Sequence, residues 1–169
     1  LANLAYARNN LGVIMAQQKN FDEAIRQFNA AKAQKPEDVS IRLNLLSVLV
    51  NLKDAAAVEQ EAREITSLRP NDVETGLKVA AALQKTENSS AAVQTLQDLA
   101  SRVSDHAELH ATLGRLLYRS GQLDASAYHL KKSHELNPGD AETRAMLDRL
   151  ARESTIEDGV STHTGLHFS

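Results

Sequence analysis

Two histidines four residues apart come nearer to a catalytic motif than any other residues of this sequence. His106 and His110 flank Ala-Glu-Leu, and histidines at positions i and i+4 of a helix share a face on which they can hold zinc. Glu108 stands only two residues after His106, which turns it about 200° away on a helix, so it cannot serve as a general base beside the metal. His106 is also predicted to lie in a turn, and no third ligand is evident. We therefore expect no metal site, and we interpret these residues as solvated capping residues.

Other catalytic signatures are missing from the sequence. Cysteine is absent, which removes disulfides, thiolate metal ligands and thiol nucleophiles. The sequence contains neither a glycine-rich phosphate loop nor a Gly-x-Ser-x-Gly element. We therefore predict that the chain is not an enzyme and that it binds no cofactor.

Charge and hydropathy restrict the partners of the chain. Its 169 residues carry a formal net charge of −3, so no basic field is available to hold nucleic acid. No run approaches the roughly 18 apolar residues of a membrane-spanning helix, and direct membrane insertion is not expected. The chain begins at Leu1 rather than Met, so we expect a processed product or a fragment of a longer protein. Bacterial cytoplasm and periplasm both stay open as locations.

The prolines indicate an internal period. Pro36, Pro70 and Pro138 are 34 and then 68 residues apart, and Ser104 stands where the missing proline would be. This period divides the chain without insertions into segments 5–38, 39–72, 73–106 and 107–140. Each segment contains two groups of small or apolar residues at spacings of three and four, separated by a polar break, which is typical of two helices. The residues taken as core-facing are Leu11, Met15, Leu49, Leu83 and Leu117.

The elements that would position any site are therefore helices. Aromatic residues make up only 4% of the chain, and the abundance of Ala and Leu favours helices over strands. The predicted helices span residues 5–18, 21–34, 39–52, 55–67, 73–86, 89–102, 107–120 and 123–136. Capping residues recur in phase before these helices. Asn20, Asp54 and Asn88 precede second helices, and Asp38, Asp72 and Asp140 precede first helices. In the third such turn, His106 stands where the other turns have aspartate, and Asp105 with Glu108 is predicted to cap the helix at residues 107–120.

This helix–turn–helix period of 34 residues resembles the tetratricopeptide repeat. The first segment shows the pattern best, with Leu11-Gly12, Met15, Phe21, Ala24, Phe28, Ala31 and Pro36. Leu46 and Ala80 replace its glycine in the next two segments, and its first aromatic is replaced throughout by Arg8, Arg42, Gly76 and His110. The resemblance implies an all-α fold, a right-handed α-solenoid of four repeats.

The segment after the fourth repeat is predicted to close the solenoid. Residues 141–153 carry Met146, Leu147 and Leu150 on one side and polar residues on the other, as a terminal capping helix requires. The predicted solenoid domain therefore covers residues 1–153. Residues 154–169 lose the periodicity and are predicted to form an irregular C-terminal tail.

The resemblance also implies a concave groove lined by the first helix of each repeat. With Leu11 and Met15 facing the core, a step of 100° per residue selects the opposite face of each first helix. The residues selected are Asn9, Val13 and Gln17; Leu43, Ser47, Val50 and Asn51; Leu77, Ala81 and Lys85; and Arg115, Tyr118 and Arg119. Exposed aliphatic side chains on this face favour a binding site, and the alternative is that neighbouring helices shield them.

Two more residues of this face correspond to a known mode of peptide binding. One subclass of the family clamps the C-terminal carboxylate of heat-shock chaperones, and Asn44 and Lys78 occupy two of the matching positions. The other three positions hold Asn9, Val13 and Glu74, where that clamp needs Lys, Asn and Lys. Asn44 and Lys78 stay in the predicted groove, but chaperone-tail binding by this mechanism is not expected.

The predicted function is a scaffold or adaptor module that binds a peptide, a helix or a folded protein in its groove, within a larger bacterial protein or assembly. A first alternative is self-association, in which the tail or a terminal helix of one copy docks in the groove of a neighbour and forms a homo-oligomer. A second alternative is that the module is the targeting arm of a longer enzyme. The sequence does not identify the partner.

Overall fold

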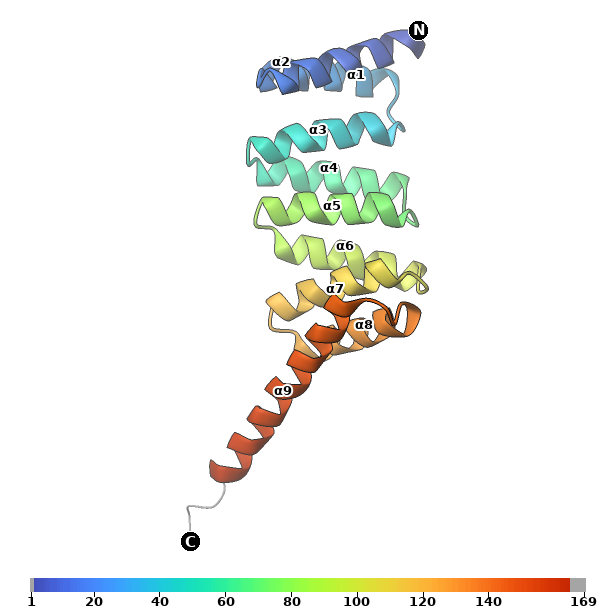
Figure 1. The fold of residues 1–169 in the computed structure, drawn as a ribbon. Coiled ribbons are helices and arrows are strands. Elements are labelled where there is room, and N and C mark those ends of the chain that lie inside the picture. The colour runs from blue at the N-terminus through green and yellow to red at the C-terminus, as the bar shows by residue number, and fades with distance from the viewer. Residues whose placement is uncertain (1, 165–169) are drawn as a thin grey trace. The chain divides into compact units, whose positions relative to one another are not determined.

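The computed structural model describes the backbone of residues 2–164 and the side chains of residues 4–153. These residues form nine α-helices and no strand. The helices are α1 (Ala2–Gln17), α2 (Phe21–Gln34), α3 (Val39–Asn51), α4 (Ala55–Leu68), α5 (Val73–Lys85), α6 (Ser89–Arg102), α7 (Ala107–Arg119), α8 (Leu123–Leu136) and α9 (Ala141–Thr164) (Figure 1). The chain divides into two compact units, unit 1 over Leu1–Arg102 and unit 2 over Val103–Ser169.

The helices pack in chain order within each unit. In unit 1, α1 packs on α2, α3 on α4 and α5 on α6, and the pairs join because α2 packs on α3 and α4 on α5. In unit 2, α7 packs on α8 and α8 on α9. The predicted two helices per 34-residue segment are thereby confirmed, and the fold is an all-α repeat solenoid.

Most predicted capping residues form the expected hydrogen bonds. Asn20 and Asp54 accept hydrogen bonds from backbone N–H groups three residues further on, and Asp38, Asp72, Asn88 and Asp140 act in the same way. The prediction for the third repeat turn was wrong, because the cap of α7 is His106 rather than Asp105. Nδ1 of His106 accepts a hydrogen bond from N–H of Leu109 at 3.3 Å. A neutral imidazole has one acceptor nitrogen, so it can replace a carboxylate in this role.

The turn inside each repeat has the same backbone conformation. Lys19, Lys53, Glu87 and Gly121 all have a positive φ, between 56° and 76°, and they are spaced by the 34-residue period. The first three adopt the left-handed conformation at a steric cost that glycine avoids. The turn geometry is therefore fixed by the position in the repeat rather than by a glycine.

Close approach of paired helices explains two glycines of the repeat pattern. A Cβ atom on Gly12 would lie 2.7 Å from the ring of Phe28, and one on Gly114 would lie 2.7 Å from Cγ of Leu130. Both distances are too short for a carbon–carbon contact. The second helix of each of these pairs therefore rests directly on the backbone of the first.

The core contains the predicted leucines, with one exception. Leu49, Leu83 and Leu117 are buried. Leu11 was predicted to face the core, but its side chain is 40% exposed. The residue at its place in the second repeat, Leu45, is buried in a helix that packs against the preceding α2. Within the part of the chain that the structure describes, no helix precedes α1, which accounts for the exposure of Leu11.

The last helix is longer than predicted. The capping helix was expected to end at residue 153, yet α9 continues to Thr164, so residues 154–164 are helical rather than irregular. No proline follows Pro138, and extending an existing helix adds one hydrogen bond for each residue that becomes fixed. The rest of the predicted tail, residues 165–169, lies outside the described residues.

Burial of Leu83 predicts a large loss of stability on truncation. Leu83→Ala removes a side chain that is 1% exposed, and buried Leu→Ala changes cost about 2–5 kcal/mol of unfolding free energy. Urea denaturation followed by circular dichroism measures the loss. A change below roughly 0.5 kcal/mol, which is typical of surface positions, would contradict the assigned helix phase.

A candidate partner-binding groove between first helices

A groove lies between the first helices α3 and α5 of unit 1. Its volume is about 380 Å³. It is lined by Leu43, Leu46, Ser47, Val50, Asn51, Lys78, Ala81, Ala82 and Lys85. Seven of these residues belong to the predicted binding face, and the structure brings them together. That they bind a partner stays a prediction.

The groove has an apolar floor and a polar rim. Leu46 and Ala82 are buried in the floor, whereas Leu43 and Val50 are half-buried and keep part of their side chains open to the groove. Sequence reasoning missed Leu46 and Ala82 because their helix phase points them toward the core. Ser47, Ala81 and the lysines lie exposed along the rim.

The two rim lysines differ in their pairing. Nζ of Lys78 lies 2.6 Å from a carboxylate oxygen of Glu74, and both side chains are mostly exposed. No ion pair involves Lys85 among the described residues. Water and salt screen an exposed pair such as Lys78–Glu74, so a ligand carboxylate can compete for Lys78 at small cost. The rim therefore favours a partner that carries acidic groups next to apolar ones.

The remaining predicted residues of unit 1 extend this face without lining the groove. The amide of Asn44 donates a hydrogen bond of 2.9 Å to Oδ1 of Asn9, which links α3 to α1. Val13 and Leu77 are half-buried, which agrees with partial shielding by neighbouring helices, and Gln17 is exposed. Asn9 and Asn44 therefore already bind each other.

Two of the three predicted residues of unit 2, Arg115 and Tyr118, are engaged by α9. Arg115 lies 3.3 Å from Glu142, and the hydroxyl of Tyr118 donates a 2.7 Å hydrogen bond to Glu153. This hydrogen bond is the main reason why the pKa of Glu153 is lowered. Arg149 also lies over the ring of Tyr118 at 5.1 Å. Of the three predicted residues of α7, only Arg119 is exposed.

Polar pairs connect the two helices of three repeats. Each pair joins a position where the family has its first aromatic to the residue 19 positions further on. The pairs are Arg8–Gln27 at 3.4 Å, Arg42–Glu61 at 2.7 Å and His110–His129 at 2.9 Å. Sequence reasoning missed them, although polar residues at both ends of a 19-residue spacing recur with the repeat.

Glu61 is the most heavily bonded member of these pairs. It is buried and accepts from Arg42 of α3 and from Lys32 of α2, the latter at 2.8 Å. Nε of Arg42 also donates to the carbonyl of Pro36 at 2.9 Å. Three consecutive helices, α2, α3 and α4, are thus tied together through one carboxylate.

The histidine pair occupies the equivalent place in unit 2. Nε2 of His110 donates to the carbonyl of Ser104, so in neutral His110 the Nδ1 atom accepts from Nδ1 of His129. Burial is the larger cause that lowers the pKa of His129 to about 4, and the neighbouring His110 adds to it. His110 is therefore a structural residue, and the predicted solvated position was wrong. Among the described residues, no three His, Asp or Glu side chains group as a metal site would require.

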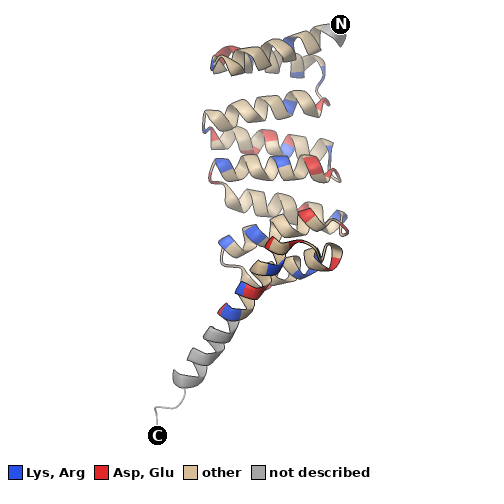
Figure 2. Cartoon of the chain, in the orientation of Figure 1, with Lys and Arg blue, Asp and Glu red and all other residues tan. Residues whose placement is uncertain are grey.

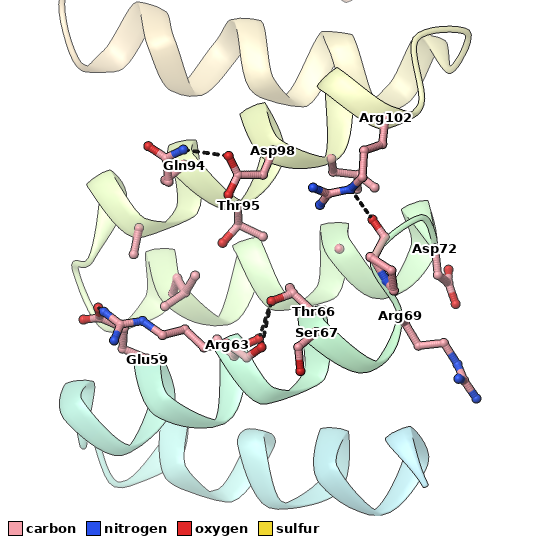
Figure 3. A pocket seen from close by; sticks show the side chains of 16 residues that line it. Glu59, Arg63, Thr66, Ser67, Arg69, Asp72, Gln94, Thr95, Asp98 and Arg102 are labelled. Carbon is pink, nitrogen blue, oxygen red and sulfur yellow. Dashed lines mark hydrogen bonds and ion pairs between the residues drawn. The ribbon is translucent and has the colours of Figure 1, made fainter. Parts of the chain in front are cut away.

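A second cavity lies on another side of unit 1, between α4, α5 and α6 (Figure 3). Its volume is about 490 Å³, and it lies where the third repeat has Gly76 and Thr95 in place of a polar pair. The side chain of Leu99 packs directly on Gly76. A Cβ atom added to Gly76 would lie 2.4 Å from Cδ2 of Leu99. Arg102 donates to the carbonyl of Pro70, and Gln94 donates to a neighbouring carboxylate. The wall combines these polar groups with apolar side chains such as Leu83 and Leu99, and its polar groups are partly satisfied by hydrogen bonds of their own.

Charged residues are interspersed over the helices rather than gathered by sign (Figure 2). Of the two helices that border the groove, α3 contains only one charged residue, Arg42, whereas α5 contains Glu74, Lys78 and Lys85. No described helix is long and apolar enough to cross a membrane.

Two family models described as tetratricopeptide repeat match the chain, over residues 5–38 and residues 78–141. The chain is a tetratricopeptide repeat protein. The two matches together cover more than half of its length, and the first coincides with the first segment defined by the proline spacing. No curated protein matches the chain in sequence.

Solved structures share the fold of this tetratricopeptide repeat chain. MamA from Desulfovibrio magneticus RS-1 is 18% identical, with a TM-score of 0.66, over 96% of this chain and 92% of that one. Another MamA structure is 15% identical, with a TM-score of 0.63, over 100% and 98%. PilF from Pseudomonas aeruginosa is 15% identical, with a TM-score of 0.63, over 90% and 70%. At these identities the likeness shows the fold alone.

The buried pair Arg42–Glu61 predicts a large effect of removing one partner. Glu61→Ala removes the buried carboxylate and leaves the Arg42 guanidinium with only the exposed carboxylate of Glu64, 3.8 Å away, and breaking a buried pair costs about 3–5 kcal/mol of unfolding free energy. The matched control Glu74→Ala breaks an exposed pair and should cost about 0–1 kcal/mol. Urea denaturation measures both variants. Equal losses would show that burial of the pair has no effect on stability.

The histidine pair predicts a loss of stability in acid. The folded pKa of His129 is about 4 and the ordinary value is 6.5, so the unfolded chain binds more protons between these pH values. The contribution of neutral His129 to the free energy of unfolding is complete above pH 6.5 and falls as the pH drops toward 4. The variant His129→Gln has the residue type found at the equivalent position of the first repeat, Gln27. Its thermal midpoint should fall less than that of the wild type between pH 6.5 and pH 4. An equal decline in both proteins would refute the assignment.

Proposed function

We propose that the chain is a non-catalytic scaffold that binds a protein or peptide partner in the groove between α3 and α5. One observation supports this proposal most. Half-buried aliphatic side chains, Leu43 and Val50, line an open groove whose rim carries Lys78 and Lys85. Apolar surface that stays open in a folded domain tends to mark a site of interaction. Stacked repeats also use such elongated surfaces to bind other proteins.

The groove suits a short apolar segment with a nearby carboxylate. Apolar side chains of the partner would cover Leu43 and Val50, and the carboxylate would pair with Lys85. Desolvated apolar anchors mainly slow dissociation, whereas charges on a rim mainly affect the rate of association and its dependence on salt. The two kinds of contact therefore predict different kinetic effects.

A partner-independent selection tests the proposal. Peptides are selected from a phage-displayed library on the whole chain, and binding of each is measured on variants with unchanged circular dichroism. Leu43→Ser with Val50→Ser should weaken binding by about tenfold or more through faster dissociation. Lys85→Glu should slow the association of acidic peptides. Leu136→Ser changes an exposed leucine in unit 2 and serves as the matched control, with no expected effect.

A second variant separates binding from folding. Ala81→Arg fills the groove from an exposed position without removing core contacts, so it should block binding while the thermal midpoint stays unchanged. If the selected peptides bind both groove variants as tightly as the wild type, the groove is not the site.

A further inference from the structure

Three polar side chains connect the first two repeats of unit 1. Glu61 of α4 binds Lys32 of α2 and Arg42 of α3. We call Lys32, Arg42 and Glu61 the polar triad. Nε of Arg42 also donates to the carbonyl of Pro36, in the turn between the two repeats. One guanidinium therefore joins a backbone carbonyl of this turn to a buried carboxylate.

The next pair of repeats has a small residue at each position of the polar triad. The residues 34 positions further on are Thr66 of α4, Gly76 of α5 and Thr95 of α6. All three line the cavity of about 490 Å³ between these helices (Figure 3). Leu99 packs on Gly76 and takes up part of the space. The cavity therefore lies where the triad would be if the repeat pattern continued.

Arg102 of α6 brings a guanidinium to this cavity from another helix. Its Nε donates to the carbonyl of Pro70 at 3.0 Å. Pro70 is equivalent to Pro36, whose carbonyl accepts from Nε of Arg42 at 2.9 Å. The residue equivalent to Arg102 in α4 is Leu68, so this arginine is not part of the repeat pattern. The carbonyl at the same position of the two turns thus holds a guanidinium in both.

The guanidinium of Arg102 lacks the carboxylate that Arg42 has. The residue equivalent to Glu61 is Thr95, whose hydroxyl carries no charge. No ion pair involves Arg102 in the part of the chain that the structure describes, and its one printed contact is made by Nε. A guanidinium presents its N–H groups as a fork, and a carboxylate can accept two of them at once. The terminal nitrogens of Arg102 can therefore bind an incoming carboxylate.

Each of the three carboxylates on the cavity wall has a partner of its own. The contacts are those of Asp72 with N–H of Thr75, Asp98 with the amide of Gln94 and Glu59 with Arg63. Together with Arg69 and Arg102, the wall carries three arginines and three carboxylates, so its formal charges cancel. A ligand carboxylate would therefore be held by direct contact with Arg102 rather than by a general positive field.

The rest of the cavity suits an apolar group of small size. Ala62, Leu83 and Leu99 are buried side chains of its lining. Its volume lies in the range of small-molecule sites, whereas a protein interface covers a broad surface. We propose that the cavity binds a small amphipathic carboxylate. The carboxylate pairs with Arg102 as Glu61 pairs with Arg42, and the apolar body covers Leu83 and Leu99. This site is separate from the groove between α3 and α5.

Methyl NMR of the whole chain tests the chemistry of the ligand. The probes are hexanoate and 3-phenylpropanoate, each compared with the alcohol of the same carbon skeleton. With at least one of the acids, the methyl signals of Leu83 and Leu99 should shift saturably. The matching alcohol should bind about tenfold more weakly or less, because it loses the charge-assisted hydrogen bonds. Arg102→Gln should weaken binding of the acid by a similar factor while circular dichroism stays unchanged.

Arg144→Gln is the matched control. Arg144 is exposed in unit 2, and its guanidinium donates to the carbonyl of Pro138, which is equivalent to Pro70. This variant has the same change of charge and should bind the acid as the wild type does. The absence of saturable shifts with both acids would overturn the proposal. Equal binding of acid and alcohol, or of the acid to the wild type and to Arg102→Gln, would overturn it as well.

Thr95→Glu tests the place of the carboxylate. The variant has glutamate at the position equivalent to Glu61, so its own carboxylate should pair with Arg102 and abolish binding of the acid. Its thermal midpoint should exceed that of Thr95→Gln, and this difference should disappear when Arg102→Gln is added to both. Unchanged binding of the acid to Thr95→Glu, or the same difference in midpoint with and without Arg102→Gln, would show that the carboxylate does not lie beside Arg102.

Discussion

A helix pair of this chain cannot bury all of its apolar surface by itself, and the rest of the structure follows from this constraint. A first helix buries one face on its own second helix, which approaches as closely as Gly12 and Gly114 allow. A further face of α3 and of α5, which includes Leu45 and Val79, is buried where the preceding helices α2 and α4 pack on them. Pairs must therefore stack, and the constant 34-residue period keeps equivalent positions in contact along the chain.

Features that depend on neighbours in the sequence could be predicted, whereas features that depend on distant helices could not. Asn20 caps a helix through an N–H group three residues away, so the sequence alone decides that contact. The exposure of Leu11 depends instead on whether a second helix lies before α1. The hydrogen bond from Arg42 of α3 to Glu61 of α4 joins two helices of one repeat, and Arg42 stands where the family has its first aromatic residue. The end of α9 was missed because no proline or capping pattern marks it.

The candidate site was likewise predictable where it depends on helix phase, and not where it depends on contacts between distant helices. Helix phase alone selected Val50 and Ala81, because the positions opposite the core of a first helix follow from 100° per residue. It could not show that α9 engages Tyr118, since that contact joins residues 35 positions apart. The groove of unit 1 combines aliphatic side chains with lysines.

Methyl NMR of the whole chain would show directly where a bound peptide lies. With a peptide selected on the wild-type protein, the methyl signals of Leu43, Val50 and Ala81 should shift in proportion to occupancy. The methyl signals of Leu96 and Leu99, which lie in α6, should stay in place. Shifts confined to residues around the cavity between α4, α5 and α6, with none in the groove, would contradict the proposal that the first helices of unit 1 form the binding surface.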